Sequence, residues 1–364
     1  MHLAQLRLRD FRNYARLDAT FSPGFHLLLG ANAQGKTNLL EAIYLLATLR
    51  SFRGAGGAQL VREQAKGYFV GATVEGQGRS SIKIYWSARE RSLSLNGTPV
   101  KRLSDYLGTL RAVVFCTDDV QLVKGTSRGR RRFLDLLLTQ SRPNYLTLLL
   151  RYTRALKARN ALLKRPQLDE EQLAGFSTEL IRVGQELIAA RLELMPRIAP
   201  LAQQAFQRVS AGVDELSLDY LPTIRGDFGV ALAASRTRER TYRTTLVGPH
   251  RDDVSFTVNG RPAGPFTSEG QKRTLAIALK MAQAEFLSGV HGSPPLLLID
   301  DVMGELDSSR RAGFLPLLNE AHQAGGQVFM TCTAENWPKD LGRELVRWEV
   351  TKGDLQSIPN TLPG

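Results

Sequence analysis

The chain has 364 residues, of which 43% are hydrophobic, enough for a substantial core and more than one domain. Its formal net charge of +13 indicates a polyanionic partner. No stretch approaches the ~18 apolar residues of a membrane span, and the charged N-terminus, MHLAQLRLRDFRNY, does not fit a signal peptide. Cys116 and Cys332 lie in separate apolar runs, which favours reduced core cysteines in a cytoplasmic protein, and the five scattered histidines form no metal-site pattern.

The first predicted element is a buried strand over FHLLLG, residues 25–30, followed by a helix from about residue 36 to 49. Between them, GANAQGKT fits the phosphate-binding pattern GxxxxGK(S/T). Its glycines let backbone N–H groups turn toward phosphates, and the helix directs its positive dipole end at them. The alternative is an ordinary glycine-rich turn, but the flanking strand and helix favour a P-loop. The predicted ATP contacts are Gly30, Ala31, Asn32, Ala33, Gln34, Gly35, Lys36 and Thr37, with Lys36 reaching the β- and γ-phosphates and Thr37 coordinating Mg²⁺.

Partial alternation of apolar and polar residues then predicts short strands up to about residue 117. From about 129 to 213 the apolar residues recur at helical spacing, in two segments separated by the turn KRPQLDE. We expect an antiparallel helix pair whose second member breaks by Pro196; a helix of about 27 residues would be roughly 40 Å long. The predicted strands are YFVGATVEG, SIKIYWSA, RSLSLNG and RAVVFCT before the helices, and DVSFTVNG, PLLLID, QVFMTCT and LVRWEV after them.

The apolar runs before and after the helical segment look like parts of one core. Their alternation with helices favours a mostly parallel sheet. We therefore predict a discontinuous head, residues 1–120 plus 245–364, into which a helical arm, residues 121–244, is inserted.

The arm carries most of the excess positive charge. Residues 121–165 contain twelve Lys or Arg and a single acid, Asp135, whereas solvated helical faces, the alternative explanation, usually mix both signs. The segment has few aromatic residues, which argues against base stacking and suits the backbone of duplex DNA. A second basic cluster, SRTRERTYR at 235–243, would extend the track. The predicted DNA contacts are Arg128, Arg130, Arg131, Arg132, Arg151, Arg154, Lys157 and Arg159.

The next segment, LVGPHRDD at 246–253, leaves two interpretations open. In the first, Pro249 and the neighbouring charges shape a loop that enters a strand, with Arg251 paired to Asp252 or Asp253. In the second, the segment lies near the nucleotide.

Two later motifs complete the pattern. In FTSEGQKRTLAIALKMAQAE, the sequence S-x-G-Q begins an amphipathic helix, with Ser268 suited to an N-cap and Gly270 offering an uncovered backbone N–H. In PLLLIDDVMGELD, four apolar residues precede Asp300, which predicts an acid at a strand end that holds Mg²⁺ beside the P-loop. Two acids on a solvated loop are the alternative, but their position relative to the P-loop favours a functional role. The predicted catalytic residues are Lys36, Asp300 and Asp301.

The order P-loop, S-x-G-Q, Asp300, GELD and a strand ending in Thr resembles the ATP-binding-cassette heads, including the SMC and Rad50 proteins. This resemblance implies an α/β P-loop NTPase head, with a mixed sheet and an antiparallel β subdomain, that carries an inserted α-helical arm. It further implies that ATP–Mg²⁺ is sandwiched between two heads, the P-loop of one facing the signature residues of the other. The residues implicated by resemblance are Ser268, Gly270 and Gln271 in the signature, Asp307 in the loop that crosses the interface, Thr331 or Thr333 near the γ-phosphate switch, and Gln121 or its rival Asp118 in place of a family glutamine.

Longer stretches make the resemblance to one family, RecF, more specific. They are LRDFRNY, GANAQGKTNLLEAIYLL, RGRRRFLD, LVGPHRDD and LLLIDDVMGELD, and together they cover nearly the whole chain. The resemblance implies an ATP-dependent homodimer on gapped or duplex DNA, near duplex–single-strand junctions, with RecR and RecO as partners and support of RecA loading and the SOS response. Asp301 stands where many cassette ATPases have a glutamate base, one methylene longer, which predicts slow DNA-dependent hydrolysis.

Three other P-loop classes fit less well. Ser268 follows Lys36 by 232 residues, far more than in the nucleotide subunit of a transporter, and the insert is strongly basic. A small-molecule kinase has no S-x-G-Q motif. A purely structural SMC clamp needs a far longer coiled coil than this arm provides.

Overall fold

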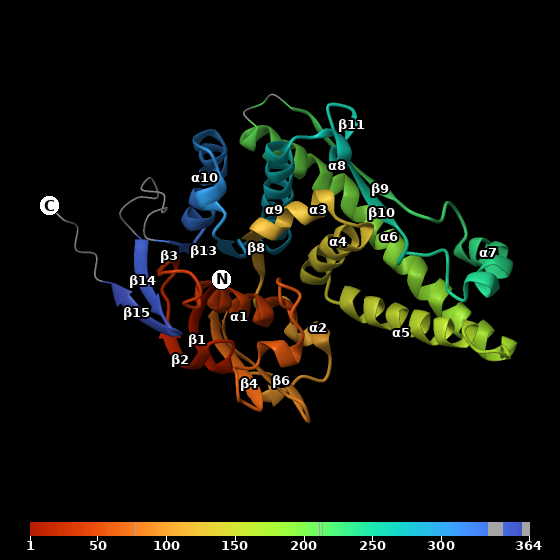
Figure 1. Cartoon of the computed structure of the whole chain (residues 1–364), viewed down its shortest axis with the longest axis horizontal. Helices are drawn as coiled ribbons and strands as arrows, with labels where there is room; N and C mark the ends of the chain where they lie inside the picture. Colours follow the sequence, from red (N-terminus) through yellow and green to blue (C-terminus); the bar gives the residue numbers. More distant parts are fainter. Residues whose placement is uncertain (77, 211, 213, 334–344, 359–364) are drawn as a thin grey trace.

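The computed structural model describes residues 1–76, 78–210, 212, 214–333 and 345–358 (Figure 1). Its central sheet has six strands in the order β15-β14-β3-β13-β12-β8. All neighbours are parallel except β15, which pairs antiparallel with β14, so the predicted mostly parallel sheet is confirmed. The strands are β3 (Gly24–Leu29), β8 (Ala112–Cys116), β12 (Leu296–Asp300), β13 (Gln327–Cys332), β14 (Leu345–Thr351) and β15 (Asp354–Ile358).

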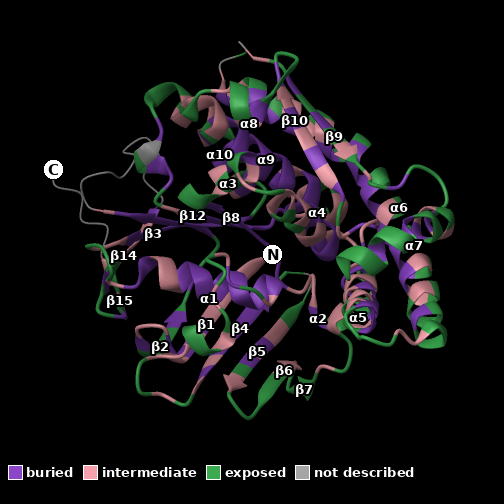
Figure 2. Cartoon of the chain, turned by 45° about the vertical axis from the view of Figure 1, so that its right-hand side comes forward, coloured by how far each residue is buried: buried purple, intermediate pink, exposed green. Residues whose placement is uncertain are grey.

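A second, antiparallel sheet lies below the first, with α1 (Lys36–Thr48) between the two (Figure 2). Apolar side chains surround this helix, which is typical of a helix buried on all sides. Its neighbours in the upper sheet include Leu28, Val114 and Leu298, which share one face of their strands. The antiparallel sheet, in the order β2-β1-β4-β5-β6-β7, contains β1 (His2–Phe11), β2 (Tyr14–Thr20), β4 (Gly67–Glu75), β5 (Arg79–Ser87), β6 (Arg91–Leu95) and β7 (Thr98–Pro99).

The opposite face of the central sheet packs against helices from the second half of the chain. Leu27, Val113 and Leu297 project from it into a cluster formed with α9 (Glu269–His291), α10 (Ser308–Gln323) and the arm. Because the strands are buried on both faces, they read as continuous apolar runs instead of alternating ones. The short elements are α2 (Leu103–Tyr106), α3 (Gln121–Lys124), α8 (Ala263–Phe266) and 3-10 turns at Gly57–Leu60, Thr117–Val120 and Met303–Glu305.

The arm consists of three helices in sequence and a fourth that packs on them (Figure 1). The prediction that the second long helix breaks by Pro196 is wrong, because α6 runs for 40 residues and contains both Pro196 and Pro200. A proline in a helix interior costs about 3 kcal/mol, but Leu194, Ile198 and Phe206 on the same stretch are fully buried and offset that cost. The arm helices are α4 (Ser127–Ser141), α5 (Tyr145–Leu163), α6 (Glu170–Val209) and α7 (Phe228–Tyr242).

The arm and the head share a hydrophobic core. A three-stranded sheet joins β9 (Leu216–Leu221), from the middle of the chain, to β10 (Asp253–Val258) and β11 (Arg261–Pro262). Buried residues of α4, α5, α6 and α9 belong to one cluster with this sheet. The division into a head, 1–120 plus 245–364, and an arm, 121–244, remains a proposal.

Across the part of the chain that the structure describes, every helix is too short or too polar to span a bilayer. Cys116 and Cys332 are not joined in a disulfide, and burial raises the pKa of both thiols, that of Cys332 to about 11. Neither cysteine is therefore a reactive thiolate at neutral pH.

Candidate nucleotide site

The P-loop turn is a backbone conformation that depends on its glycines. Gly30 has a φ of 150° and Gly35 a φ of 121°. A Cβ at Gly30 would fall against the carbonyl oxygen of Val350, and one at Gly35 would lie 2.6 Å from the Asn13 amide nitrogen. Both positions therefore require glycine for conformation and for space.

Lys36 begins α1 and is folded back into the loop. Its side chain is buried, and Nζ donates to the carbonyl oxygens of Gly30, at 2.6 Å, and Ala31, at 3.0 Å. The first turn of α1 contains no acidic residue, so the positive end of the helix is not neutralised from within. The turn thus combines an ammonium group and open backbone N–H groups, the donors that an anion needs.

Residues of the LRDFRNY stretch hold the loop from behind, a role that sequence reasoning did not assign. Asn13 Nδ2 donates to the Gln34 carbonyl at 2.8 Å, and the Tyr14 hydroxyl donates to the Gly35 carbonyl at 3.0 Å. Asn38, in the first turn of α1, donates to Asn13 Oδ1 at 2.8 Å. In the sequence, Asn13 and Tyr14 are marked only by their place at the short turn between two strands, β1 and β2.

The predicted magnesium ligands meet beside the loop. Thr37 Oγ1 donates to Asp300 Oδ1 at 2.8 Å, and Thr331 Oγ1 donates to the same oxygen at 3.0 Å. Burial raises the pKa of Asp300, while the hydrogen bonds from the two threonines oppose that rise. Hydroxyl and carboxylate oxygens are the hard donors that Mg²⁺ prefers. Thr37 and Asp300 therefore fit a magnesium ion that completes its shell with phosphate oxygens and water.

Asp301 occupies a different position from Asp300 although the two are adjacent. Its φ of 54° is left-handed, and its backbone N–H donates to Thr331 Oγ1 at 3.0 Å. The buried Thr331 hydroxyl thus contacts both acids, while Asp301 itself is exposed. Thr333 follows the end of β13 and is only half-buried, so Thr331 is the threonine with direct contacts to the acids.

A cavity of about 470 Å³ joins the P-loop to the acids. Its described lining includes Lys36, Thr37, Asp300 and Asp301, and also Asp118 in the loop after β8. Gln121, the rival of Asp118, lies one turn further along the chain, on exposed α3, and is not part of this lining. Between the two candidates, the cavity favours Asp118.

Sequence reasoning also missed Arg53, which lines the same cavity. Its Nη1 donates to Asn38 Oδ1 at 3.2 Å, and its charge opposes the rise that burial causes in the pKa of Asp300. The available signal was a pair of cations, Arg50 and Arg53, shortly after the helix that follows the P-loop. Arg53 is positioned to add a second cation to the phosphate site.

The S-x-G-Q turn lies outside this cavity. Ser268 is the predicted N-cap of α9, with a capping box in which its Oγ accepts from the Gln271 N–H at 3.2 Å and Gln271 Oε1 accepts from the Ser268 N–H at 3.0 Å. Ser268 is exposed, and none of Ser268, Gly270 and Gln271 belongs to the described lining of the phosphate cavity. One copy of the chain therefore presents the two halves of the predicted site on separate surfaces.

Arg310, a second residue that sequence reasoning missed, links the S-x-G-Q turn to Asp307. Asp307 caps α10 by accepting from the Arg310 N–H at 2.9 Å, and its carboxylate also pairs with the Arg310 guanidinium. Arg310 Nε donates to Thr274 Oγ1 at 2.8 Å, and Thr274 in turn donates to the Gly270 carbonyl at 3.0 Å. Because Arg310 contacts both segments, the signature turn and the Asp307 loop form one structural unit.

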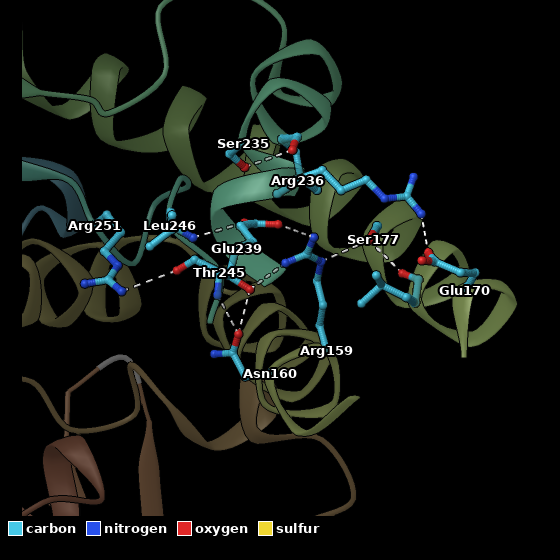
Figure 3. Close-up of polar contacts among 12 residues, drawn as sticks. Arg159, Asn160, Glu170, Ser177, Ser235, Arg236, Glu239, Thr245, Leu246 and Arg251 are labelled. Atoms are coloured by element: carbon cyan, nitrogen blue, oxygen red, sulfur yellow. Dashed lines mark hydrogen bonds and ion pairs between the residues drawn. The ribbon is translucent and has the colours of Figure 1, made fainter. Parts of the chain in front are cut away.

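Among the predicted DNA contacts, Arg159 is a misassignment. Its side chain is 2% exposed and donates to Glu239, Thr245 and Ser177 (Figure 3). This contact holds α5 to α7 inside the arm, so the guanidinium cannot reach a phosphate. No local pattern indicates this pair, because Glu239 lies 80 residues from Arg159 along the chain.

The other predicted DNA contacts differ in how many hydrogen bonds and ion pairs they make within the protein. Arg130 makes a two-pronged pair with Asp253, at 2.7 and 2.8 Å, and Arg131 donates to the Asp252 carbonyl at 2.5 Å. The exposed residues are Arg128, Arg132, Arg151, Arg154 and Lys157, of which Arg132 also donates to the Ser51 carbonyl and Arg151 pairs with Glu179. Their contact with DNA remains a prediction.

The LVGPHRDD segment is a structural junction. Asp252 is fully buried and accepts hydrogen bonds from Tyr220 and from the Thr223 N–H, at 2.7 Å for the latter. Arg191 of α6 donates to the Pro249 carbonyl at 2.7 Å and lies 3.5 Å from Asp252. The predicted pairing of Arg251 with its neighbouring acids is wrong, because residues of the arm helices, of the end of β9 and of the loop after it hold Asp252 and Asp253. The described lining of the phosphate cavity contains no residue of this segment.

Removing Arg159 should destabilise the chain through this buried pair. In Arg159→Met the carboxylate of Glu239, which is fully buried, loses its cation, and breaking a buried pair on one side costs about 3–5 kcal/mol. The free energy of unfolding, measured by urea titration, should fall by that amount. The matched control is Arg154→Met on the exposed face of α5, with an expected change within about 0.5 kcal/mol. Equal stabilities of the two variants would contradict the assignment.

Comparison with known proteins places these features in context. The chain matches the family model described as RecF/RecN/SMC N terminal domain over residues 2–354. A protein of Symbiobacterium thermophilum named DNA replication and repair protein RecF is 41% identical over 360 residues, covering 93% of this chain and 95% of that protein. A solved structure of the recombination mediator protein RecF with ATP, from the RecFOR pathway, is 29% identical with a TM-score of 0.89 over 98% of both chains. An SMC head domain of Pyrococcus furiosus, 16% identical with a TM-score of 0.57, shares the fold over 98% of this chain and 96% of that one.

Proposed function

Because the chain belongs to the RecF family of DNA replication and repair proteins, we propose that it is an ATPase whose ATP–Mg²⁺ site is shared between two copies of the chain. The observation that carries this proposal is the separation of the two halves of the site. Lys36, Thr37 and Asp300 converge on one cavity, whereas the Ser268 turn is exposed on another surface. The similar RecF structure is described with ATP, which supports ATP as the nucleotide.

In this proposal each residue of the cavity has a distinct task. The Lys36 ammonium exchanges its contacts with the Gly30 and Ala31 carbonyls for phosphate oxygens. Thr37 and Asp300 hold Mg²⁺, which neutralises phosphate charge when bound. Asp301, exposed at the cavity wall, accepts a proton from the attacking water. An aspartate reaches one methylene less far than a glutamate, so we expect slow hydrolysis.

The second copy would contribute the signature turn. The exposed Ser268 hydroxyl and the N-terminal N–H groups of α9 would face the γ-phosphate of ATP bound by the first copy. The acid in this first turn, Glu269, is paired with Lys124 and Lys272. Arg310 fixes this turn to Asp307, so both reach the interface in one orientation. ATP would then act as the contact that joins two chains, and its hydrolysis as the release step.

We propose that this dimer binds DNA in the cytoplasm. The DNA would be gapped or duplex, near a junction with single-stranded DNA. The supporting observation is the excess of exposed cations on the arm, including Arg154 and Lys157 of α5. The RecFOR pathway of the similar structure supports RecR and RecO as further partners, with RecA loading and the SOS response as the wider role.

Reversing two exposed charges of the arm should weaken duplex binding. For Arg154→Glu/Lys157→Glu the slope of log affinity against log salt should fall by about 2, one unit for each lost phosphate contact. Fluorescence anisotropy of a labelled duplex, with ATP present and at several salt concentrations, measures this slope. The matched control is Arg89→Glu/Lys101→Glu, which alters two exposed cations near the antiparallel sheet. If the slope falls equally in the arm variant and in the control variant, α5 is not the DNA-binding surface.

A further inference from the structure

Two adjoining hollows form one groove between the head and the arm. The first, of about 560 Å³, lies between the end of α1 and helices α4 and α5, and the second, of about 680 Å³, lies between the end of α1 and the antiparallel sheet. Both are lined by Leu49, Arg50, Leu103 and Arg132, so the two hollows adjoin at these residues. We call this feature the head–arm groove. Its described lining contains no P-loop residue, so it is separate from the phosphate cavity.

The floor of the groove is apolar along its length. Leu146, Leu149, Leu150 and Leu156 of α5 line the arm section. Leu45, Leu60, Leu93 and Trp86 line the head section. Leu150 is 45% exposed, and Leu149 and Leu156 of the same helix are half-buried. Leu93 and Trp86 in the head section are also half-buried, so both sections offer partly exposed apolar side chains, as protein-binding sites do.

The rim of the groove is positively charged. The cations along it are Arg50, Arg91, Arg128, Arg131 and Arg132. Asp135 is the only acid in the described lining, and its Oδ1 already accepts from Arg191, at 2.8 Å, and from Tyr145, at 2.6 Å. His250 adds no charge at neutral pH, because burial lowers its pKa to about 4. The described lining of the groove therefore contains more cations than carboxylates.

We propose that the head–arm groove binds an acidic segment of a partner protein, with apolar side chains spaced to enter the leucine-lined floor. Carboxylates of the segment would pair with the rim arginines, and its apolar side chains would cover Leu149 and Leu150. Arginine and tryptophan are the residues most often found at the energetic centre of such interfaces. The hollow volumes are in the range that encloses a few side chains.

Nucleic acid fits this groove less well than a peptide does. Single-strand binding needs aromatic faces for the bases, and the Trp86 ring is already stacked on Tyr68, with centroids 5.9 Å apart, and faces Arg91 at 6.0 Å. A sugar–phosphate backbone would leave the leucine floor without an apolar partner. Arg128, Arg131 and Arg132, which the sequence analysis predicts as DNA contacts, would face the protein segment in this proposal.

A labelled peptide tests the proposal on the full chain without nucleotide, so that failure here and failure of the shared ATP site can be told apart. The probe is an 18-residue fluorescein-labelled peptide with leucines at helical spacing and glutamates elsewhere, and binding is followed by anisotropy. We expect a dissociation constant of about 10 μM, typical of a weak and transient contact. Leu150→Glu and Arg132→Glu, both at exposed positions, should each weaken it at least about tenfold, or 1.4 kcal/mol.

The controls distinguish specific binding in the groove from non-specific attraction of an acidic peptide to a basic protein. Arg225→Glu, an exposed cation outside the groove lining, should leave peptide affinity unchanged. A second peptide with serine in place of every leucine, at equal charge, should bind at least tenfold more weakly. The proposal is overturned if the two peptides bind equally, if Leu150→Glu has no effect, or if an 18-residue oligothymidylate displaces the peptide and loses its own affinity in the same variants.

Discussion

Lys36→Met is expected to weaken ATP binding by about 100-fold or more. The lysine is buried in the P-loop, and its ammonium makes hydrogen bonds at 2.6 and 3.0 Å to loop carbonyls that stand in for phosphate oxygens. Hydrogen bonds to a charged group contribute about 1.5–3 kcal/mol each, and each 1.4 kcal/mol is a factor of about ten in affinity. Two such bonds lost without replacement therefore give the expected change. Isothermal titration with ATP and Mg²⁺ measures it.

Methionine has nearly the same length as lysine, so the loop should keep its shape. Circular dichroism and the melting temperature should confirm that the Lys36→Met variant is folded. Lys101→Met, which removes an exposed lysine far along the chain from the P-loop, should bind ATP as the unaltered chain does. If Lys36→Met binds ATP within about threefold of the unaltered chain, the cavity beside Asp300 is not the nucleotide site.

The parts of this site that could be predicted from the sequence are those whose interacting residues are close together in the chain. The P-loop depends on glycine conformation and on a lysine and a threonine next to them, all within residues 30–37. The N-cap at Ser268 depends on Gln271, three residues later. The strand before Asp300 is a short apolar run. Local pattern was enough in each case, because the interacting groups are neighbours in the chain.

Contacts between distant residues account for what was missed or wrong. Asn13 supports Gln34, and Arg159 pairs with Glu239, 80 residues away, so neither role has a local pattern. A charge count could not show that Arg159 points inward. The continuation of α6 past Pro196 depends on the buried side chains that pack on it. Tertiary packing determines these features, and local patterns in the sequence do not show which distant residues pack together.

The shared site predicts that two inactive variants restore one another. Ser268→Arg should still bind ATP, because its P-loop is intact, but should stay monomeric and hydrolyse no ATP, since a bulky cation replaces the hydroxyl at the tip of the exposed turn. Lys36→Met keeps an intact turn but loses ATP. In a mixture, the P-loop of the first variant and the turn of the second form one complete site per mixed dimer. About a quarter to a half of the unaltered ATPase activity should return.

Mass measurement in solution, with ATP and Mg²⁺, distinguishes this shared site from a site complete within one chain. Each variant alone should stay monomeric and the mixture should form dimers, and a double variant with both changes should restore nothing when mixed with either. Arg310→Ala offers a milder form of the same test, because it frees the turn from Asp307 without blocking it and should weaken dimerisation while leaving ATP affinity unchanged. A Ser268→Arg chain that dimerises and hydrolyses ATP by itself would mean that the S-x-G-Q turn only caps α9. The exposed position of Ser268, outside the phosphate cavity, is the reason to expect the opposite result.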